Sequence, residues 1–182
     1  MSSEKQEKII ILGGSGSGKD FLFRKLSQMN LRGCLKMTTR PQRKYEIQLV
    51  NYNFVDEYNF LEKINNDEFL CYQTFNVTPK GRDPEIWYYG ITKQEFEQSK
   101  LFIMTPGEFY KLTPEQRKGC FVVYLDIDRK VREKRLFNRE DKNDDVSRRL
   151  DADEMDFKGF KDYDLKITDP EFEAEWIYNL MN

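Results

Sequence analysis

The stretch IIILGGSGSGKDFLF, residues 9–23, decides the fold. A short run of β-branched residues ends in glycines, and the glycines lead into a segment whose apolar residues have helical spacing. Strand, glycine-rich loop and helix, in this order, are the context in which G-x-x-x-x-G-K forms a phosphate-binding loop. Consecutive small residues let backbone N–H groups turn towards phosphate oxygens, and the N-terminus of the helix adds partial positive charge. The sequence therefore predicts a phosphate site in this stretch.

Two side chains at the end of the loop carry its chemistry. Lys19 is placed to bridge the outer phosphates of a nucleotide, whereas Asp20 stands where a Ser or Thr is usual. A carboxylate at that position can ligate Mg²⁺ directly or through water, so we predict Asp20 as the metal ligand. The alternative is that Asp20 only caps the helix. The nucleotide-binding residues expected in the loop are Gly13, Ser15, Gly16, Ser17, Gly18, Lys19 and Asp20.

Composition excludes several classes of protein. The chain has 182 residues, 38% of them hydrophobic and 34% charged, as expected of one soluble globular domain. A formal charge of −2 argues against a protein that coats nucleic acid. Three cysteines far apart give neither a disulfide framework nor a zinc pattern. Because histidine is absent, catalysis by Ser-His-Asp or Cys-His and zinc held by histidine are excluded.

The N-terminus, MSSEKQEK, is charged and lacks the apolar region of a signal peptide. No apolar run in the sequence is long enough to span a bilayer. We therefore expect a cytoplasmic protein without membrane or nucleic-acid partners, acting on a small molecule as a monomer or homodimer.

Strands alternate with helices along the chain, which predicts an α/β fold with a parallel sheet. The expected strands are 8–12, 33–39, a short one after 51, 73–76, 86–91, 100–104, 119–128 and 162–169. The expected helices are 18–29, one opened by Asp56 and reaching towards 70, 93–99, 129–140, one starting at Val146, and 170–182.

The segment TTRPQRKYEIQLVNYNFV, residues 38–55, resembles the nucleotide-monophosphate-binding region of guanylate kinases. Their pattern T-T-R-x-x-R-x-x-E, followed by Y-x-F-V, is matched without a gap. WYYGIT (87–92) is similar to their Y-Y-G-x-T element, RLFNRE and RRL resemble their two lid segments, and DYDLKITD resembles their closing strand. The phosphate loop, ending in G-K-D, also resembles that of ribose 1,5-bisphosphate phosphokinases.

The resemblance implies a P-loop kinase three-layer sandwich with a parallel sheet, a small acceptor-binding insertion and a lid. It implies one domain over residues 1–182. The core would comprise 8–35, 93–131 and 160–182, the acceptor-binding region 36–92, and the lid 132–150. A lid of this kind closes over ATP and excludes water.

The resemblance also assigns residues. Arg40 and Arg43 are spaced so that two guanidinium groups can converge on one acceptor phosphate, and the phenols of Tyr52 and Tyr89 can donate to it. The acceptor-binding residues expected are Thr39, Arg40, Arg43, Tyr52, Cys71, Tyr89 and Thr92. In the lid, Arg135 and Arg149 would clamp the transferring phosphate and Arg139 would lie against the donor adenine. Arg148 is an alternative to Arg149, because the linker is one residue shorter than usual. The catalytic residues expected are Lys19, Arg40, Arg135 and Arg149.

The pattern breaks where guanylate kinases read guanine with two carboxylates. Cys71 stands at the place of the first, and Thr105 and Gly107 stand at the acidic positions of the second segment. Glu68 or Glu108 could compensate, although neither is in register.

A further acid, Asp126 of LDID (125–128), imitates a metal-binding acid at the end of a strand, whereas Asp128 is expected to cap the following helix.

The resulting prediction is a kinase that transfers the γ-phosphoryl group of ATP, with Mg²⁺, to a nucleoside monophosphate. GMP or dGMP is the family default. Ribose 1,5-bisphosphate or an unusual (deoxy)nucleotide is the alternative acceptor. A different class is also open, a non-catalytic guanylate-kinase-like binding module.

Overall fold

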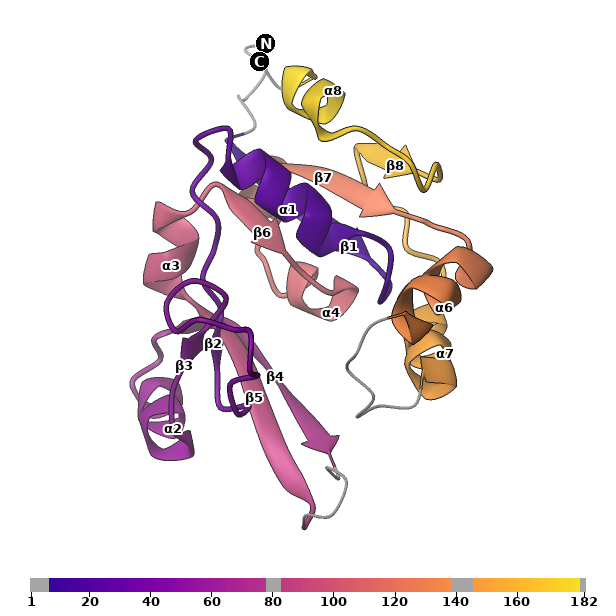
Figure 1. The fold of residues 1–182 in the computed structure, drawn as a ribbon. Coiled ribbons are helices and arrows are strands. Elements are labelled where there is room, and N and C mark those ends of the chain that lie inside the picture. The colour runs from indigo at the N-terminus through magenta and orange to yellow at the C-terminus, as the bar shows by residue number, and fades with distance from the viewer. Residues whose placement is uncertain (1–6, 78–82, 139–145, 181–182) are drawn as a thin grey trace. The chain divides into compact units, whose positions relative to one another are not determined.

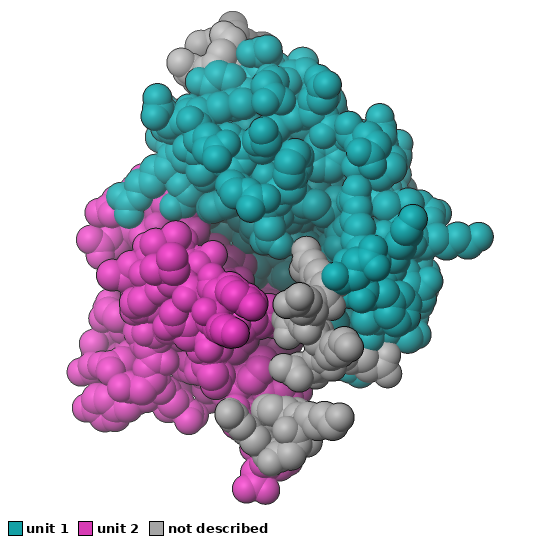
Figure 2. All heavy atoms as spheres, viewed as in Figure 1, with its two compact units in different colours: residues 1–33, 100–182 teal, residues 34–99 magenta. Residues whose placement is uncertain are grey.

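The computed structural model describes residues 7–77, 83–138 and 146–180. The chain divides into two compact units, one formed by residues 1–33 and 100–182 and the other by residues 34–99 (Figure 2). It leaves the first unit after Gly33 and returns at Lys100. There the amides of Lys100 and Leu101 both donate to the carbonyl of Arg32, at 2.8 and 3.1 Å. The second unit is therefore a continuous insertion into the first.

The first unit is built on a parallel sheet of four strands in the order β6-β1-β7-β8 (Figure 1). The strands are β1 (Lys8–Gly13), β6 (Leu101–Ile103), β7 (Cys120–Leu125) and β8 (Leu165–Ile167). β1 lies in the middle, with Ile9 opposite both Leu101 and Phe121. The runs IIIL and FVVYL read as continuous apolar segments because both faces of such a sheet are covered. The sequence-based prediction of a parallel α/β sheet is confirmed.

Helices α1 (Lys19–Ser27) and α8 (Ala174–Asn179) cover one face of this sheet (Figure 1). Leu22 and Leu26 of α1 share a buried cluster with Ile9 and Ile11 of β1 and Val123 of β7. Each such leucine contributes roughly 1.5–3 kcal/mol of transfer free energy. This packing fixes the start of α1, and with it the phosphate loop, at the carboxyl end of β1.

The opposite face is covered by aromatic side chains that follow helix α7 (Val146–Asp156). Because side chains alternate along a strand, Tyr124 of β7 points away from α1. Its ring stacks on Phe157 with centroids 5.2 Å apart and meets Phe160 edge-on at 5.5 Å. α7 is thereby anchored to the sheet just beyond its last turn.

Three short or medium helices complete the first unit. α6 (Arg129–Phe137) begins after Asp128, whose carboxylate accepts from the amide of Lys130, so the expected cap is confirmed. α4 (Pro106–Phe109) and α5 (Pro114–Lys118) were not expected from the sequence. Both start with Thr-Pro and are closed by capping boxes, in which a Thr hydroxyl and a Glu or Gln side chain each satisfy a backbone amide.

The second unit has a mixed sheet in the order β3-β2-β5-β4. Its elements are β2 (Met37–Thr38), β3 (Asn53–Phe54), α2 (Glu57–Asn65), β4 (Phe69–Val77), β5 (Glu85–Thr92) and α3 (Lys93–Gln98). β4 and β5 form a long antiparallel hairpin. α2 starts with Asp56 as its cap, as expected, and packs Phe60 on Phe69 with ring centroids 4.4 Å apart.

Three expected boundaries in this unit are wrong. The strand expected over 73–76 is longer and spans Phe69–Val77. The strand expected over 33–39 is reduced to Met37–Thr38, because the amide of Leu35 donates to the side chain of Glu95 instead of to a neighbouring strand. The helix expected to approach 70 ends at Asn65, and Asp67 turns the chain with a φ of 54°. In the three described ranges, no helix combines the length and the apolar composition that crossing a bilayer requires.

The contact of β5 with Phe69 of β4 and Phe60 of α2 predicts a sensitive position at Gly90. A Cβ added there would lie 2.5 Å from Phe69 Cε1 and 3.1 Å from Phe60 Cζ. Gly90→Ala should therefore lower the free energy of unfolding by about 2 kcal/mol through overpacking. Urea unfolding followed by circular dichroism measures the change. The control is Gly119→Ala, where the nearest atom would lie at 3.6 Å. Equal stabilities of the two variants would contradict the packing described.

Candidate functional site

The loop between β1 and α1 depends on glycines at two positions. Gly16 has a φ of 77°, and a Cβ there would lie 2.8 Å from the carbonyl oxygen of Arg132. Gly18 is the N-cap of α1 with a φ of 103° and provides no side-chain cap. Left-handed backbone and close approach both favour glycine. The loop can therefore curl so that its peptide groups face inward, as a phosphate site requires.

Lys19 closes this loop. Its ammonium donates to the carbonyls of Gly13 and Gly14 at 2.7 and 2.9 Å. Both acceptors belong to the first residues of the loop, so the side chain folds back along it instead of extending into solvent. The charge of Lys19 is thus already held at the place where phosphates are expected to bind.

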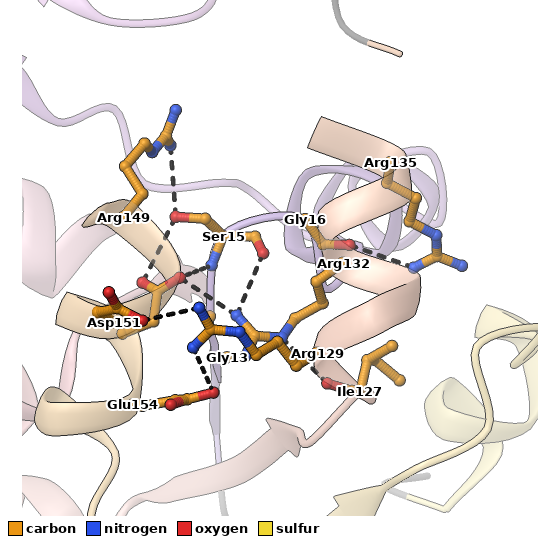
Figure 3. Close-up of polar contacts among 12 residues, drawn as sticks. Gly13, Ser15, Gly16, Ile127, Arg129, Arg132, Arg135, Arg149, Asp151 and Glu154 are labelled. Carbon is orange, nitrogen blue, oxygen red and sulfur yellow. Dashed lines mark hydrogen bonds and ion pairs between the residues drawn. The ribbon is translucent and has the colours of Figure 1, made fainter. Parts of the chain in front are cut away.

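Two arginines from other elements reach the same loop (Figure 3). Arg135 of α6 donates to the carbonyls of Gly16 and Ser17 at 3.3 and 3.4 Å, and to that of Pro170 at 2.7 Å. Arg149 of α7 donates to Ser15 Oγ at 3.3 Å. Arg148, the alternative to Arg149, is exposed. The expected adenine contact, Arg139, lies outside the described residues.

An acidic group at the loop was not foreseen from the sequence. Asp153 of α7 accepts from the amide of Ser15 at 2.7 Å and from its hydroxyl at 3.4 Å. Arg132 of α6 lies 3.3 Å from the same carboxylate and is held by the carbonyl of Ile127 at 3.0 Å. One signal could have found the aspartate. Asp153 follows Arg149 by four residues on one helix, so both face the same way.

The loop fits a polyphosphate ligand by two observations. A carboxylate already lies on the Ser15 amide, so this peptide group binds an anion. Ser17 Oγ is buried and has no hydrogen-bond partner within the described part of the chain. An orphaned buried hydroxyl of this kind needs a partner, and a phosphate oxygen would supply one.

Asp20 is in the first turn of α1 and is exposed. The N-cap position belongs to Gly18, so Asp20 does not cap the helix. Across the described ranges there is no group of three or more His, Cys, Asp or Glu that could hold a metal ion by itself. A Mg²⁺ site at Asp20 would therefore need phosphate oxygens to complete it, which is the usual arrangement for this ion.

Asp126, the other acid considered for a metal, has two partners in the structure. Its carboxylate pairs with Lys166 at 2.6 Å and accepts from the hydroxyl of Tyr124 at 3.2 Å. Burial and the nearby carboxylate of Asp126 raise the pKa of Tyr124 to about 12, so the phenol stays protonated. These contacts give Asp126 a structural role at the end of β7.

The second unit holds its own anion-binding candidate around Arg40. This guanidinium is almost fully buried, with a side-chain exposure of 4%, and it pairs with Glu46 through two bonds of 2.7 and 3.0 Å. The neighbouring rings of Tyr52 and Phe54 lie against it, with centroids 5.4 and 5.5 Å from its central carbon. A bidentate partner and two rings fix the plane of the guanidinium.

The buried Arg40–Glu46 pair shifts the pKa values of the groups around it. Burial by itself would raise the pKa of Glu46, but hydrogen bonds from the Arg40 guanidinium and the Arg43 amide lower this pKa below its ordinary value. The pKa of Tyr89 is raised, because burial outweighs the opposing charges of Arg40 and Arg43. The Tyr89 ring also meets Tyr52 edge-on at 6.1 Å. The phenol of Tyr89 therefore remains a protonated donor beside Arg40 at neutral pH.

Other residues expected to bind the acceptor have structural partners. Thr39 Oγ1 accepts from the amide of Tyr88 at 3.0 Å, and Thr92 caps α3 by accepting from the amide of Glu95. Cys71 is buried in β4.

The two acids considered as replacement guanine readers are engaged as well. Glu68 pairs with Lys63 at 2.7 Å, and Glu108 closes the capping box of α4 at 2.8 Å from the amide of Thr105.

Known proteins point to one family. The family model described as guanylate kinase matches residues 5–83. A guanylate kinase of Mesomycoplasma hyopneumoniae is 39% identical over 106 residues, which cover 54% of this chain and 49% of that protein. One from Carboxydothermus hydrogenoformans is 27% identical over 173 residues, or 91% of this chain and 81% of that protein. The crystal structure of a guanylate kinase from Anaplasma phagocytophilum has a TM-score of 0.67 at 22% identity, over 97% and 86% of the two chains.

A parallel sheet with a glycine-rich phosphate loop at the carboxyl end of its central strand defines an α/β protein of the phosphate-loop class. Within this class, the chain is similar to guanylate kinases, through the family model over residues 5–83 and through relatives such as that of Carboxydothermus hydrogenoformans. The match to the Mesomycoplasma relative spans about half the length of that protein.

The Arg40–Glu46 pair predicts a distinctive pH dependence of stability. Since the pKa of Glu46 is lowered on folding, its stabilisation is complete above the ordinary glutamate pKa of about 4.3 and is lost as the pH falls through the folded value. Glu46→Gln should lower the free energy of unfolding by about 2 kcal/mol at neutral pH, because it leaves a buried guanidinium without its counter-charge. The difference from wild type should shrink in acid.

Urea unfolding at neutral and acidic pH tests this. The matched control is Glu68→Gln, whose partner Lys63 is partly exposed, so screening by solvent should make its effect much smaller. A Glu46→Gln difference that stays constant with pH would contradict the assignment.

Proposed function

We propose that this protein is a nucleoside monophosphate kinase, which transfers the γ-phosphoryl group of ATP to the phosphate of a nucleoside monophosphate. One observation supports the proposal above the others. Each of the two units holds an anion-binding group, the loop with its anion-binding Ser15 amide in the first and the buried Arg40 in the second. A transfer between two phosphates needs one such group for the donor and one for the acceptor.

At the donor, the loop amides and Lys19 would hold the β- and γ-phosphates. Arg135 and Arg149, both already at the loop, would neutralise charge that spreads over the transferring group. In the transfer, the bond between the γ-phosphorus and its bridging oxygen breaks, and ADP leaves with the electron pair. An oxygen of the acceptor phosphate forms the new bond. That oxygen is already anionic at neutral pH, so the reaction needs no histidine as a general base.

At the acceptor, Arg40 would bind the phosphate through the donors that Glu46 and the carbonyl of Pro41 leave available. Glu46 fixes its orientation, which lowers the entropy cost of binding. Arg43 is exposed beside this pair and would add a second charge, while Tyr52 and Tyr89 would donate from their phenols. Orientation and charge neutralisation are the main contributions a protein makes to this type of reaction.

Mg²⁺, when bound, would neutralise part of the negative charge of the phosphates. Asp20 is the residue we assign to it, because its carboxylate follows Lys19 at the loop and Mg²⁺ is commonly held by one or two carboxylates together with phosphate oxygens. We further propose that the protein works in the cytoplasm as a monomer or homodimer.

GMP or dGMP is the acceptor that the relatives support, since they are named guanylate kinases. The alternative, ribose 1,5-bisphosphate or an unusual nucleotide, is favoured by the residues at the guanine-reading places. Cys71 is buried, Thr105 caps α4, and Gly107 has no side chain. A binding module without catalysis remains the third candidate, and the assembled loop with Lys19, Arg135 and Arg149 argues against it.

A coupled ADP-release assay across all nucleoside monophosphates and ribose 1,5-bisphosphate tests the proposal. We expect turnover with GMP and dGMP above all other acceptors, and a 10²–10³-fold lower kcat, roughly, for Lys19→Ala, because an electrostatic contact to the donor phosphates is lost. Turnover with ribose 1,5-bisphosphate alone would establish the alternative acceptor. Absence of both turnover and ATP·Mg²⁺ binding would favour the binding module.

Asp20 has its own test. Asp20→Ala should raise the Mg²⁺ concentration needed for half-maximal turnover by about tenfold, because a charged ligand is lost. The control is Glu57→Gln, which removes another acid from the first turn of a helix, α2, away from any phosphate loop. If Asp20→Ala leaves both the Mg²⁺ dependence and the turnover unchanged, the assignment is wrong.

A further inference from the structure

The contact between Asp153 and the phosphate loop has the geometry of an anion on its binding site. The carboxylate accepts from the Ser15 amide at 2.7 Å, and its second oxygen accepts from the Ser15 hydroxyl at 3.4 Å. Amides of a phosphate loop are the groups that contact nucleotide phosphates. One N–H makes one good hydrogen bond, so the Ser15 amide cannot serve the carboxylate and a phosphate oxygen fully at the same time.

The surroundings strengthen this contact. Arg132 Nη1 lies 3.3 Å from the carboxylate, and the two side chains are exposed by only 9% and 19%. The guanidinium also lies beneath the loop, at 3.5 Å from the carbonyl of Ser15. A partly desolvated, charge-assisted set of hydrogen bonds is stronger than a surface ion pair. The ion pair with Arg132 therefore stabilises the position of Asp153 on the loop.

The carboxylate also has space beside it. A cavity of about 150 Å³ is lined by Gly14, Asp126, Arg132, Asp153 and Glu154, among others. The side chain of Asp153 can leave the Ser15 amide in this direction without displacing the packed core. Arg132, held by the carbonyl of Ile127, would stay in place and meet whichever anion occupies the amide.

We propose that Asp153 is an internal competitor of the donor phosphates, a carboxylate that occupies the anion position on the Ser15 amide and is exchanged for a phosphate oxygen when a nucleoside triphosphate binds. That the displacing ligand is a nucleoside triphosphate rests on the proposed function. That Asp153 competes with an anion rests only on its hydrogen bond with the Ser15 amide. Only molecules in which Asp153 has left the amide bind the triphosphate fully, so the measured Kd exceeds the intrinsic Kd by the inverse of that fraction.

The exchange gives α7 two opposite tasks. Arg149 and Asp153 are four residues apart on this helix and both reach Ser15, one as a donor to its hydroxyl and the other as an acceptor from its amide. Arrival of a phosphate favours the arginine and expels the aspartate, because like charges in a poorly solvated site repel strongly. Asp153 thus sets the affinity for the donor without touching the reacting atoms.

Calorimetric titration of the full chain with metal-free inorganic tripolyphosphate tests the proposal, with ATP·Mg²⁺ as a second probe. We expect Asp153→Ala to lower the Kd for tripolyphosphate about tenfold, and Asp153→Asn, which keeps the shape but loses the charge, to lower it by a smaller factor. The control is Asp151→Asn. It removes the same charge from the same helix, but Asp151 pairs with Arg129 at 2.7 Å and not with the loop (Figure 3). This control should bind as the wild type does.

The outcomes separate this proposal from the proposed function. An unchanged or higher Kd in both Asp153 variants, with normal binding by the wild type, would overturn the competition alone. Weaker binding of ATP·Mg²⁺ only would also overturn it, by assigning Asp153 to the metal. Failure of every variant and of the wild type to bind either probe would overturn the competition together with the donor site. If Asp153→Ala does not fold by circular dichroism, Asp153→Asn alone decides.

Discussion

Peptide groups that face into a buried loop must find hydrogen-bond partners, and this requirement organises the first unit. In the turn between β1 and α1, several carbonyls and one amide bond to side chains. Lys19 and Arg135 take the carbonyls, and Asp153 takes the Ser15 amide. Because these side chains come from α1, α6 and α7, helices far apart in sequence are bound to one short segment. The conformation of the loop and the positions of these helices therefore depend on each other.

In the second unit, the group that needs partners is a single buried cation, Arg40. Arg40 is stable in its interior because Glu46 accepts two of its hydrogen bonds and the neighbouring rings of Tyr52 and Phe54 lie against it. In the first unit Arg132 has the same relation to Asp153. Each unit thus pairs a poorly exposed guanidinium with a carboxylate. The difference is that Glu46 orients its arginine, whereas Asp153 lies on a loop amide that the donor would need.

Local signals in the sequence predicted the parts of the fold that depend on neighbouring residues. The strand, loop and helix at the start of the chain and the caps Asp56 and Asp128 are all of this kind. What could not be predicted depends on partners distant in sequence. The strand at Met37 is short because the Leu35 amide bonds to Glu95.

The same distinction applies to the candidate site. Its glycines, Lys19 and Arg40 follow from motifs. The Asp153 contact spans 138 positions, and no periodicity connects Asp153 to Ser15. By contrast, the partners of Glu68 and Glu108 are local, since Lys63 and Thr105 lie five and three residues away, and the T-x-x-E spacing of a capping box is itself a sequence signal.

The hydrogen bonds from the amides of Lys100 and Leu101 to the carbonyl of Arg32 join the two ends of the insertion, and this has a consequence for the order of folding. The second unit is continuous in sequence, and its longest hairpin joins neighbouring strands, so its contacts are local and quick to make. The first unit needs residues on both sides of the insertion, and β1 cannot pair with β6 until the whole intervening segment has been drawn together. An insertion that has already collapsed shortens that closure, so the second unit aids the folding of the first unit, which holds the glycine-rich loop.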